Sequence, residues 1–407
     1  MLENIALFTA ALGLQYPWEV SKVDFAPTKG RMDIYISREP GSKHPCPKCK
    51  IQCNVHDSRA RTWRHLNFFQ YRTYLHCDIP RVKCPTHGVL QVEPPWARPG
   101  SGFTLLFEAF MIELAKAMPI NSLAKTVGEH DTRIWRVINH YVKEAREKQD
   151  FSNVANIGID ETSSKRGHNY VSVFVDLDKS KVIYATEGKD AKTVKSFAKD
   201  LQQHNGEPNS IGNICCDMSP AFIKGAEDNF PHAAITFDKF HVMKIINEAV
   251  DQVRRQEQQV NESLKNTRYI WLKNPMNLTG KQNARLRSLS QMNLKTARAY
   301  NIKLSLQEFW EIEDQDIATT YLKKWYFWAT HSRLEPIKQA AYTIKRHWDG
   351  VIQYITSRIN NGILEGINSL IQATKRKARG YRNTKNLITI IYLTCSNLKM
   401  DLPKAFL

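Results

Sequence analysis

The sequence predicts a multidomain protein of mixed α/β class. Its 407 residues exceed the ~250–300 residues at which a single core stops growing, so two to four domains are expected. Five of its eight cysteines fall between Cys46 and Cys84, which favours a small metal-binding module over the disulfide framework of a secreted protein. Two regions of helical periodicity flank a run of short apolar strands, and these strands supply the β part of the class.

The chain is strongly basic. It carries 58 Lys and Arg against 40 Asp and Glu, which leaves a formal net charge of +18 and an isoelectric point near 9.5. This excess favours a polyanionic partner, although a basic ribosomal or membrane-surface protein would share it. The N-terminus lacks a basic n-region and no run reaches the ~18–20 apolar residues of a membrane span, so we expect a cytoplasmic protein with no membrane partner.

The first elements are a short helix, two strands and a zinc module. Residues 1–40 hold the amphipathic helix and strands near 20–25 and 32–37. In the zinc-binding module at 41–98, Cys46-Pro-Lys-Cys49 and Cys84-Pro-Thr-His87 form two knuckles that can close one structural, tetrahedral Zn²⁺ site, as in a zinc ribbon. Other residues of the module remain alternative ligands: Cys53, His56, His65, His76 and Cys77.

Residues 99–150 predict a helix-turn-helix DNA-binding domain. Apolar side chains recur at three- and four-residue intervals over 103–118, and two further helices follow at 121–128 and 131–147. The last helix carries side chains suited to base edges and to phosphate. These are Arg133, Arg136 and Asn139 for bases, with Lys143 and Arg146 for phosphate. The alternative is an ordinary three-helix unit with a solvated basic face.

Strands dominate the next segment, 151–241. Three meandering strands, at 154–160, 169–177 and 181–187, are followed by a helix, a strand at 211–216, a second helix and a strand at 233–237. This order is typical of an RNase H-like fold, in which the first and fourth strands are parallel neighbours. Asp160 and Asp217, which end these two strands, would then lie side by side. Competing positions are Glu161, Asp176 and Asp238.

A third acidic residue stands on a late helix. Residues 242–350 are expected to be helical, and 351–407 to hold a closing helix and a C-terminal helix. Glu365 lies in Asn361-Gly-Ile-Leu-Glu-Gly-Ile-Asn, which has helical periodicity. Two aspartates and this glutamate can hold two Mg²⁺ (or Mn²⁺) ions, which prefer oxygen ligands. The nearby polar and basic residues suit a phosphate backbone: Asn361, Asn368, Lys375, Arg376, Lys377, Arg379 and Arg382.

Taken in order, these motifs resemble the DDE transposases of bacterial insertion sequences, specifically the ISL-three family. The matching segments are the two knuckles, the helix-turn-helix, Ile157-Gly-Ile-Asp-Glu, Asp217-Met-Ser, Phe237-Asp-Lys-Phe-His-Val and the Glu365 segment. The resemblance implies a catalytic triad of Asp160, Asp217 and Glu365, and an α-helical insertion at 242–350 within the RNase H-like domain. Asp238 and His241 resemble an Asp-x-x-His element, to which we assign a structural or DNA-contacting role. Many relatives have glycine where this chain has Lys50.

A member of this family would bind the terminal inverted repeats of an insertion sequence and catalyse metal-dependent strand cleavage and strand transfer. Its partner would be double-stranded DNA, both the element ends and the target. Because two ends must be paired, a homodimer or higher assembly on DNA is expected. The main alternative is a catalytically silent DNA-binding regulator on the same fold. A structure-selective nuclease and an RNA-binding zinc protein explain fewer of these features.

Overall fold

The structure is a computed structural model that describes residues 2–165, 167–359 and 362–403. Its described residues divide into two compact units, the first formed by residues 2–141 with 399–403 and the second by the described residues of 142–398. Within the described ranges, no helix combines the length and the apolar character needed to cross a membrane.

The first unit opens with a helix and a five-stranded sheet. The helix is α1 (Leu2–Ala11), and the sheet has the order β1-β2-β6-β5, with β7 paired to β6. Its strands are β1 (Trp18–Ala26), β2 (Arg31–Arg38), β5 (Val55–Arg64), β6 (Arg72–Cys84) and β7 (Gly88–Gln91). A two-stranded ribbon joins β3 (His44–Pro45) to β4 (Gln52–Cys53). Because β2 pairs in parallel with β6, the expected boundary at residue 40 falls inside one sheet.

Three helices complete this unit: α2 (Leu105–Ala117), α3 (Ile120–Val127) and the start of α4 (Asp131–Glu147). The Thr104 side chain caps α2 by accepting a hydrogen bond from the Phe107 amide. Gly128 ends α3 in the left-handed conformation, which turns the chain into α4. Glu108 is fully buried and accepts a hydrogen bond from the Tyr141 hydroxyl at 2.9 Å, so a charged group ties α2 to α4.

The second unit contains a five-stranded mixed sheet of order β10-β9-β8-β11-β12. Its strands are β8 (Asn156–Lys165), β9 (Asn169–Asp176), β10 (Lys181–Glu187), β11 (Asn213–Cys216) and β12 (Ala234–Phe237). The first three form an antiparallel meander, and β11 pairs in parallel with both β8 and β12. Two helices connect the later strands, α5 (Ala191–Gln203) and α6 (Pro220–Asn229). The first and fourth strands are thus parallel neighbours, as the element order predicts.

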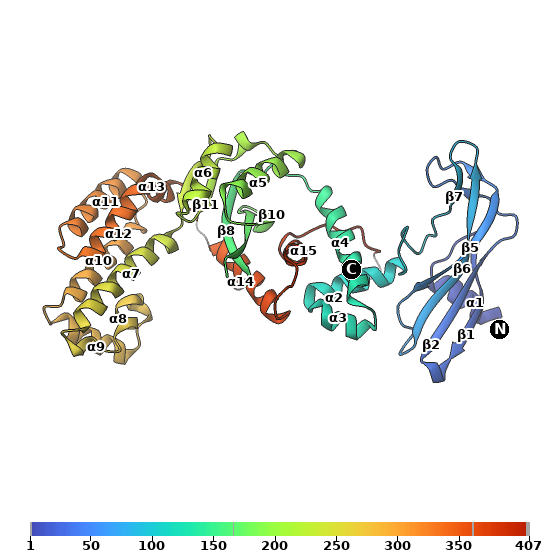
Figure 1. Cartoon of the computed structure of the whole chain (residues 1–407), viewed down its shortest axis with the longest axis horizontal. Helices are drawn as coiled ribbons and strands as arrows, with labels where there is room; N and C mark the ends of the chain where they lie inside the picture. The colour runs from blue at the N-terminus through green and yellow to red at the C-terminus, as the bar shows by residue number, and fades with distance from the viewer. Residues whose placement is uncertain (1, 166, 360–361, 404–407) are drawn as a thin grey trace. The chain divides into compact units, whose positions relative to one another are not determined.

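The two faces of this sheet are covered by different helices. Successive side chains of a strand point to opposite faces. In β8, Ile157 and Ile159 join the apolar cluster that contains Phe197 of α5, whereas Gly158 between them meets Leu364 of α14. Two C-terminal helices contact β8 and β10 respectively, α14 (Gly362–Lys377) and α15 (Thr384–Cys395). Figure 1 shows α14 beside β8, away from α5 and α6.

Between β12 and α14 the chain is helical and rich in buried tryptophan. Its helices are α7 (Lys239–Gln258), α8 (Arg268–Leu272), α9 (Gly280–Ser290), α10 (Lys295–Phe309), α11 (Gln315–Thr330), α12 (Glu335–Arg346) and α13 (Trp348–Ser357). Two short 3₁₀ helices lie in the connections of this segment, η3 (Glu262–Leu264) and η4 (Pro275–Asn277). Two others lie earlier in the chain, η1 (Pro27–Lys29) between β1 and β2 and η2 (Pro208–Ser210) before β11. Both α10 and α12 pack on α7, and Trp271, Trp310 and Trp325 are almost fully buried.

Candidate functional site

A soft-ligand cluster lies in the first unit. Among the described residues, one group of three or more potential metal ligands has its ligand atoms all within 4.8 Å of one another, and its members are Cys46, Cys49, Cys84 and His87. Cys49 Sγ lies 3.6 Å from Cys84 Sγ, and His87 Nδ1 lies 3.8 Å from Cys46 Sγ and 3.6 Å from Cys84 Sγ. A tetrahedron with Zn–S bonds of ~2.3 Å has edges of ~3.8 Å, so this spacing suits Zn²⁺.

Both knuckles use a left-handed backbone after their second ligand. Lys50 follows Cys49 with φ of 62°, and its amide donates to the Cys46 carbonyl at 2.9 Å. Gly88 follows His87 with φ of 72°. Glycine adopts this conformation without strain, whereas a side chain at the same φ is disfavoured. The sequence difference at residue 50 therefore leaves the turn intact and places strain in it.

Hydrogen bonds from the backbone make two of the thiols acidic. A hydrogen bond from the Cys49 backbone lowers the pKa of Cys46. Burial alone would raise the pKa of Cys84, but hydrogen bonds from the His87 and Thr86 backbone outweigh it and lower that pKa to about 7. The thiolate is the form that binds metal, so these hydrogen bonds favour the metal-binding form of Cys46 and Cys84. At Cys49, a backbone hydrogen bond from Ile51 is outweighed by burial and the neighbouring thiols, which raise the pKa.

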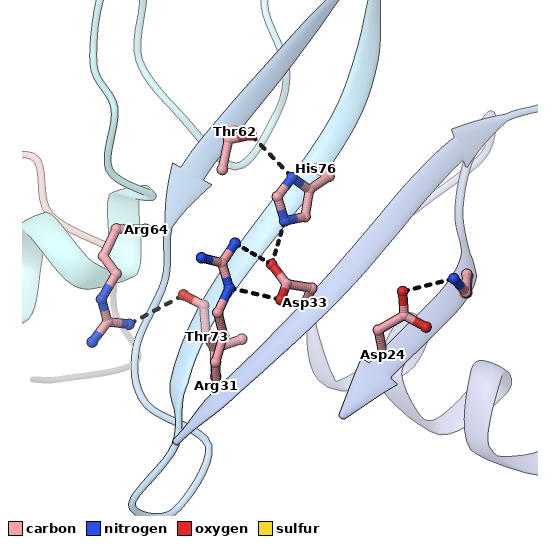
Figure 2. Close-up of polar contacts among 8 residues, drawn as sticks. Asp24, Arg31, Asp33, Thr62, Arg64, Thr73 and His76 are labelled. Atoms are coloured by element: carbon pink, nitrogen blue, oxygen red, sulfur yellow. Dashed lines mark hydrogen bonds and ion pairs between the residues drawn. The ribbon is translucent and has the colours of Figure 1, made fainter. Parts of the chain in front are cut away.

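The alternative histidine ligands have other partners. His76 lies between two side chains of the sheet, with Nε2 2.6 Å from Asp33 Oδ1 and Nδ1 3.0 Å from Thr62 Oγ1, as Figure 2 shows. The ring of His65 contacts Thr104 Oγ1 at 2.9 Å, and burial lowers the pKa of His65 to about 4. Neither ring reaches the cysteine cluster.

The remaining alternatives are also outside the cluster. The Cys53 thiol donates to the Ile51 carbonyl at 3.3 Å, and burial raises its pKa. Burial raises the pKa of Cys77 to about 12, which keeps it a neutral thiol. His56 is exposed on β5.

The helix-turn-helix presents part of the expected DNA-contacting set. On α4, Arg136 and Asn139 are exposed. Lys143 is also exposed, and its Nζ lies 3.8 Å from a carboxylate oxygen of Glu147, a surface pair that is worth little and leaves the cation available. These three residues have the accessibility that recognition of DNA requires.

Two other arginines of α4 are engaged inside the protein. Arg133 forms an ion pair with Glu129 and lies 4.1 Å over the Phe103 ring, so it is half-buried. Arg146 is buried and binds both carboxylate oxygens of Asp200, at 2.7 and 2.9 Å. The assignment of Arg146 to phosphate is therefore wrong, because this ion pair and its burial remove it from the surface.

The two candidate aspartates occupy neighbouring parallel strands. Because β11 pairs with β8 up to Cys216 opposite Ile159, Asp217 and Asp160 are the next residues on each strand. The sequence suggested that Asp160 ends its strand. In the structure β8 continues beyond Asp160 to Lys165 by pairing with β9. It lies instead where β8 parts from β11.

A shared spacing holds α14 on β8. Two residues of a strand advance ~6.8 Å and four residues of a helix ~6.0 Å, so the two elements can stay in step. The matched pairs are Leu364 against Gly158, Asn368 on Asp160 and Gln372 on Thr162. Gly158 is required at the first pair because a Cβ there would lie 2.7 Å from Leu364 Cδ1. This packing places the exposed Glu365 one residue after Leu364, on a helix that packs against β8.

The Asp160 carboxylate is held at both oxygens. The Glu161 amide donates to Oδ1 at 2.8 Å, and Asn368 Nδ2 donates to Oδ2 at 2.6 Å. Burial raises the pKa of Asp160 to about 6, and the charges of Asp217 and Asp238 act in the same direction. Asn368, which the sequence assigned to phosphate, thus serves to orient this carboxylate.

A cavity of about 360 Å³ joins two of the three candidate acids. Asp160 and Glu365 both line it, together with Phe240, His241, Asn368, Ser369 and Gln372. Asp217 is not among the lining residues. Its carboxylate oxygen Oδ1 accepts a hydrogen bond from the Ser219 backbone N–H at 3.0 Å. A cavity with carboxylates on its wall can hold cations and the phosphate that they neutralise.

A third aspartate extends the row. Phe237, the last residue of β12, pairs with Cys216, the last residue of β11, so Asp238 and Asp217 directly follow two neighbouring strands. Asp238 is buried, and its Oδ2 lies 3.1 Å from His241 Nδ1. This contact raises the pKa of His241 and favours its cationic form beside the acids. The sequence named Asp238 and His241, but it gave no reason to place the imidazole in the cavity of Asp160.

In the basic run after Glu365, as on α4, one residue is engaged inside the protein and others are exposed. Lys375 Nζ donates to the Ser163 carbonyl at 2.6 Å, so Lys375 fastens α14 to β8. Its neighbours in the run, Arg376, Lys377, Arg379 and Arg382, are exposed. Asn361 lies outside the described residues.

Comparison with known families covers the parts of the chain in order. Residues 157–391, more than half of the chain, match a DDE-type model of family ISL3 described as "Transposase". Residues 92–142 match the helix-turn-helix domain of transposase family ISL3. Residues 42–87 match the zinc-finger of transposase IS204/IS1001/IS1096/IS1165.

Individual relatives extend over almost the whole chain. The transposase for insertion sequence element IS1557 of Mycobacterium tuberculosis is 27% identical and covers 99% of this chain and 98% of its own. The transposase for IS1001 of Bordetella parapertussis is also 27% identical, over 92% and 94% of the two chains. A solved structure of the simian T-cell lymphotropic virus intasome with PP2A regulatory subunit B56 gamma matches at 14% identity. It covers 46% of this chain and 68% of that one, and its TM-score of 0.18 carries no argument. The zinc ribbon, the helix-turn-helix and the transposase region together show that the chain belongs to the ISL3 family of DDE transposases.

Proposed function

We propose that the second unit carries an RNase H-like catalytic domain, expected at residues 151–241 and 351–407 and interrupted by an α-helical insertion at 242–350. The described residues from 399 onward belong to the first unit instead. The strand order β10-β9-β8-β11-β12, with parallel pairing only around β11, supports this assignment. The remaining expected divisions are 1–40, 41–98 and 99–150, of which the first two share one sheet. A zinc ribbon and a helix-turn-helix precede the catalytic domain, which suits recognition of DNA before the reaction.

Asp160, Asp217 and Glu365 are the proposed catalytic carboxylates. The observation that carries this proposal is the register of α14 on β8, in which Asn368 binds Asp160 and Glu365 lines the same cavity. Asp217 is the residue beside Asp160 in the parallel pairing of β11 with β8. Three segments far apart in sequence would therefore contribute to one site.

The residues fit two Mg²⁺ or Mn²⁺ ions. Carboxylate and amide oxygens are the ligands that these cations prefer. Two buried oxygens near Asp160, Glu161 Oε2 and Asn368 Oδ1, have no hydrogen-bond partner among the described residues, although such atoms are normally satisfied. Burial, and to a smaller extent the charges of Asp217 and Asp238, raises the pKa of Asp160, and a bound cation would offset both effects.

Two such ions, when bound, would activate a water or a DNA 3′-hydroxyl for attack and would stabilise the departing oxygen. The protein's part is to present ionised carboxylates in fixed positions. Asn368 and the Glu161 amide hold the two oxygens of Asp160, and each oxygen keeps a second lone pair for a ligand. His241, held by Asp238, supplies positive charge near the phosphate.

DNA contacts are proposed for the exposed polar and basic residues. On α4 these are Arg136, Asn139 and Lys143, and after α14 they are Arg376, Lys377, Arg379 and Arg382. Arg133, Asn361, Asn368 and Lys375 were also expected to contact DNA; of these, Asn368 and Lys375 hold α14 and Asp160 instead. A bound structural Zn²⁺, a homodimer or higher assembly on DNA, and a cytoplasmic location complete the proposal.

A reporter plasmid that carries the element's ends tests this function. We expect excision and joined products with the intact protein and none with Glu365→Gln, which keeps the side-chain shape and removes its charge. Glu335→Gln is the matched control, because Glu335 is an exposed glutamate on α12. Equal products from intact protein and Glu365→Gln would show that the active site is misassigned. Bound ends without products from the intact protein would indicate a regulator.

A further inference from the structure

A second cavity opens next to the carboxylates. It has a volume of about 420 Å³, within the range of small-molecule sites, and it follows α7 away from the sheet. Phe240 lines both this cavity and the one that contains Asp160 and Glu365. Phe240 is therefore part of the wall of both cavities.

One stripe of α7 forms the wall of this cavity. Its members are spaced by three or four residues and share a helix face, and they are Phe240, Lys244, Asn247, Asp251 and Arg255. The Phe240 side chain is 58% exposed, although it is large and apolar. An exposed aromatic ring at the mouth of a phosphodiester-cleaving site is suited to stacking on a nucleobase.

Asn247 gives the cavity a hydrogen-bonding group without a partner. Its Oδ1 is buried and has no hydrogen bond to any of the described residues. Leaving a buried polar atom unsatisfied is unfavourable, and a ligand can satisfy it. The amide can read the donor and acceptor edge of a base in the way that asparagine does in DNA recognition.

The rim of the cavity is positively charged. Arg255 and Arg268 are largely exposed, and both lie near the buried carboxylate of Asp251, at 3.4 and 3.6 Å. Lys244 adds a third cation to the rim, and the exposed Glu248 adds a negative charge. Asp251 already has Arg254 as a close partner at 2.8 Å, so the exposed guanidinium groups remain able to bind a phosphate.

We propose that this cavity binds a single unstacked nucleotide of the DNA that is cleaved or joined at the carboxylates. The base stacks on Phe240, its edge meets Asn247, and the adjoining phosphate meets the cations of the rim. The inference rests on the proposed active site, because that site fixes where the DNA lies. The nucleotide can come from the element end, from its flank or from the target.

Fluorescence of 2-aminopurine tests the proposal and identifies the source. The base is placed singly at each position around the cleavage point of the element end, in the flank, or in target DNA, and binding is measured without divalent metal. We expect one position to brighten several-fold on binding, because the fluorescence of 2-aminopurine rises when it leaves the stack. Phe240→Ala should abolish this signal. Phe327→Ala should retain it, since Phe327 is 63% exposed on α11 and does not line the cavity.

An abasic nucleotide supplies the second test. Phe240→Ala should lower cleavage by about 10-fold, the size of one lost base–aromatic contact. Removing the base at the bright position should restore most of that loss, because nothing then has to be unstacked. The proposal is overturned if no position brightens, if Phe240→Ala keeps the signal, or if the abasic substrate gives no rescue. Because the binding signal needs no catalysis, it tests the cavity even where Glu365→Gln remains active.

Discussion

The zinc cluster and the carboxylate site are built in opposite ways. The zinc ligands come from two tight turns, one in the β3–β4 ribbon and one between β6 and β7, and their four ligand atoms converge within 4.8 Å. The carboxylates come from two neighbouring strands and from a helix 148 positions later in the chain (365 − 217), and they depend on strand register and on packing of α14. Local turns therefore determine the first site, whereas tertiary packing determines the second.

Loss of zinc should give the largest effect and should be confined to the first unit. Cys49→Ser removes a ligand, so we expect less than stoichiometric zinc and a lower melting temperature for that unit. Zinc binding stabilises small zinc domains by ~10 kcal/mol or more, which exceeds any single packing contact. Metal content and calorimetry of the full chain measure both effects.

Cys53→Ser is the matched control for this prediction. Cys53 belongs to the same module but donates to the Ile51 carbonyl and lies outside the cluster. It should keep one zinc per chain. If Cys53→Ser and Cys49→Ser lost zinc equally, the ligand set would be wrong.

The contrast explains what sequence could predict. Cys46, Cys49, Cys84 and His87 follow a spacing rule that needs no tertiary information, although choosing them over His65 or His76 required the structure. The order of strands likewise predicted that β8 and β11 are neighbours. Sequence spacing can predict those ligands that a single turn brings together, here Cys46 with Cys49 and Cys84 with His87.

Gly158 tests the packing that positions Glu365. Gly158→Val would place methyl groups where Leu364 and Leu177 already lie within 2.9 Å of a Cβ, so α14 has to move away from β8. We expect the free energy of unfolding to fall by ~1–3 kcal/mol. Strand cleavage should fall by more than this loss of stability alone would cause, because Glu365 is displaced. Thermal unfolding and cleavage of end DNA measure the two, and zinc content should not change.

Gly280→Ala provides the comparison for that variant. Gly280 begins α9, and no atom lies within 4 Å of a Cβ built there. It should retain both stability and cleavage. Full cleavage by Gly158→Val would mean that Glu365 does not need this register.

Asp160→Asn should stabilise the metal-free protein at neutral pH. The folded state holds the Asp160 proton more tightly than the unfolded chain does, so ionisation of this carboxyl opposes folding. The penalty is absent below the ordinary pKa of 3.8 and complete above the folded pKa of about 6. The gain should therefore reach ~1–3 kcal/mol at pH 7.5 and vanish near pH 4.

Magnesium should reverse this order. Ions that bind the native protein stabilise it, and the intact carboxylate binds them better than the amide does. At pH 7.5, Asp160→Asn should therefore have the higher melting temperature without Mg²⁺, and the intact protein should have the higher melting temperature with Mg²⁺. A variant that is less stable than the intact protein without metal would contradict the unfavourable burial of Asp160.

Some features of the molecule follow from no pattern in the sequence. Arg146 belongs to a basic face by periodicity, yet Asp200 pairs with it from 54 positions away. Lys303 lies in a charged helical stretch, yet it is fully buried and donates to the carbonyls of Trp271 and Leu272. In each case a partner supplied by another element decides whether a charge faces water, and periodicity cannot identify that partner.

The smallest predicted effect separates the two knuckles from each other. Lys50 and Gly88 have the same left-handed backbone, with φ of 62° and 72°, but only Gly88 is free of strain there. Lys50→Gly should therefore stabilise the zinc-loaded protein by ~0.5–1 kcal/mol, after the greater entropy of glycine in the unfolded chain offsets part of the gain. Gly88→Lys should lower stability by a similar amount, since no atom lies within 4 Å of a Cβ at Gly88 and strain is the only penalty. The double exchange should be close to neutral in thermal unfolding and in release of zinc to a chelator. If Lys50→Gly were destabilising, contacts of the lysine side chain would outweigh its backbone strain, and the two knuckles would not be equivalent turns.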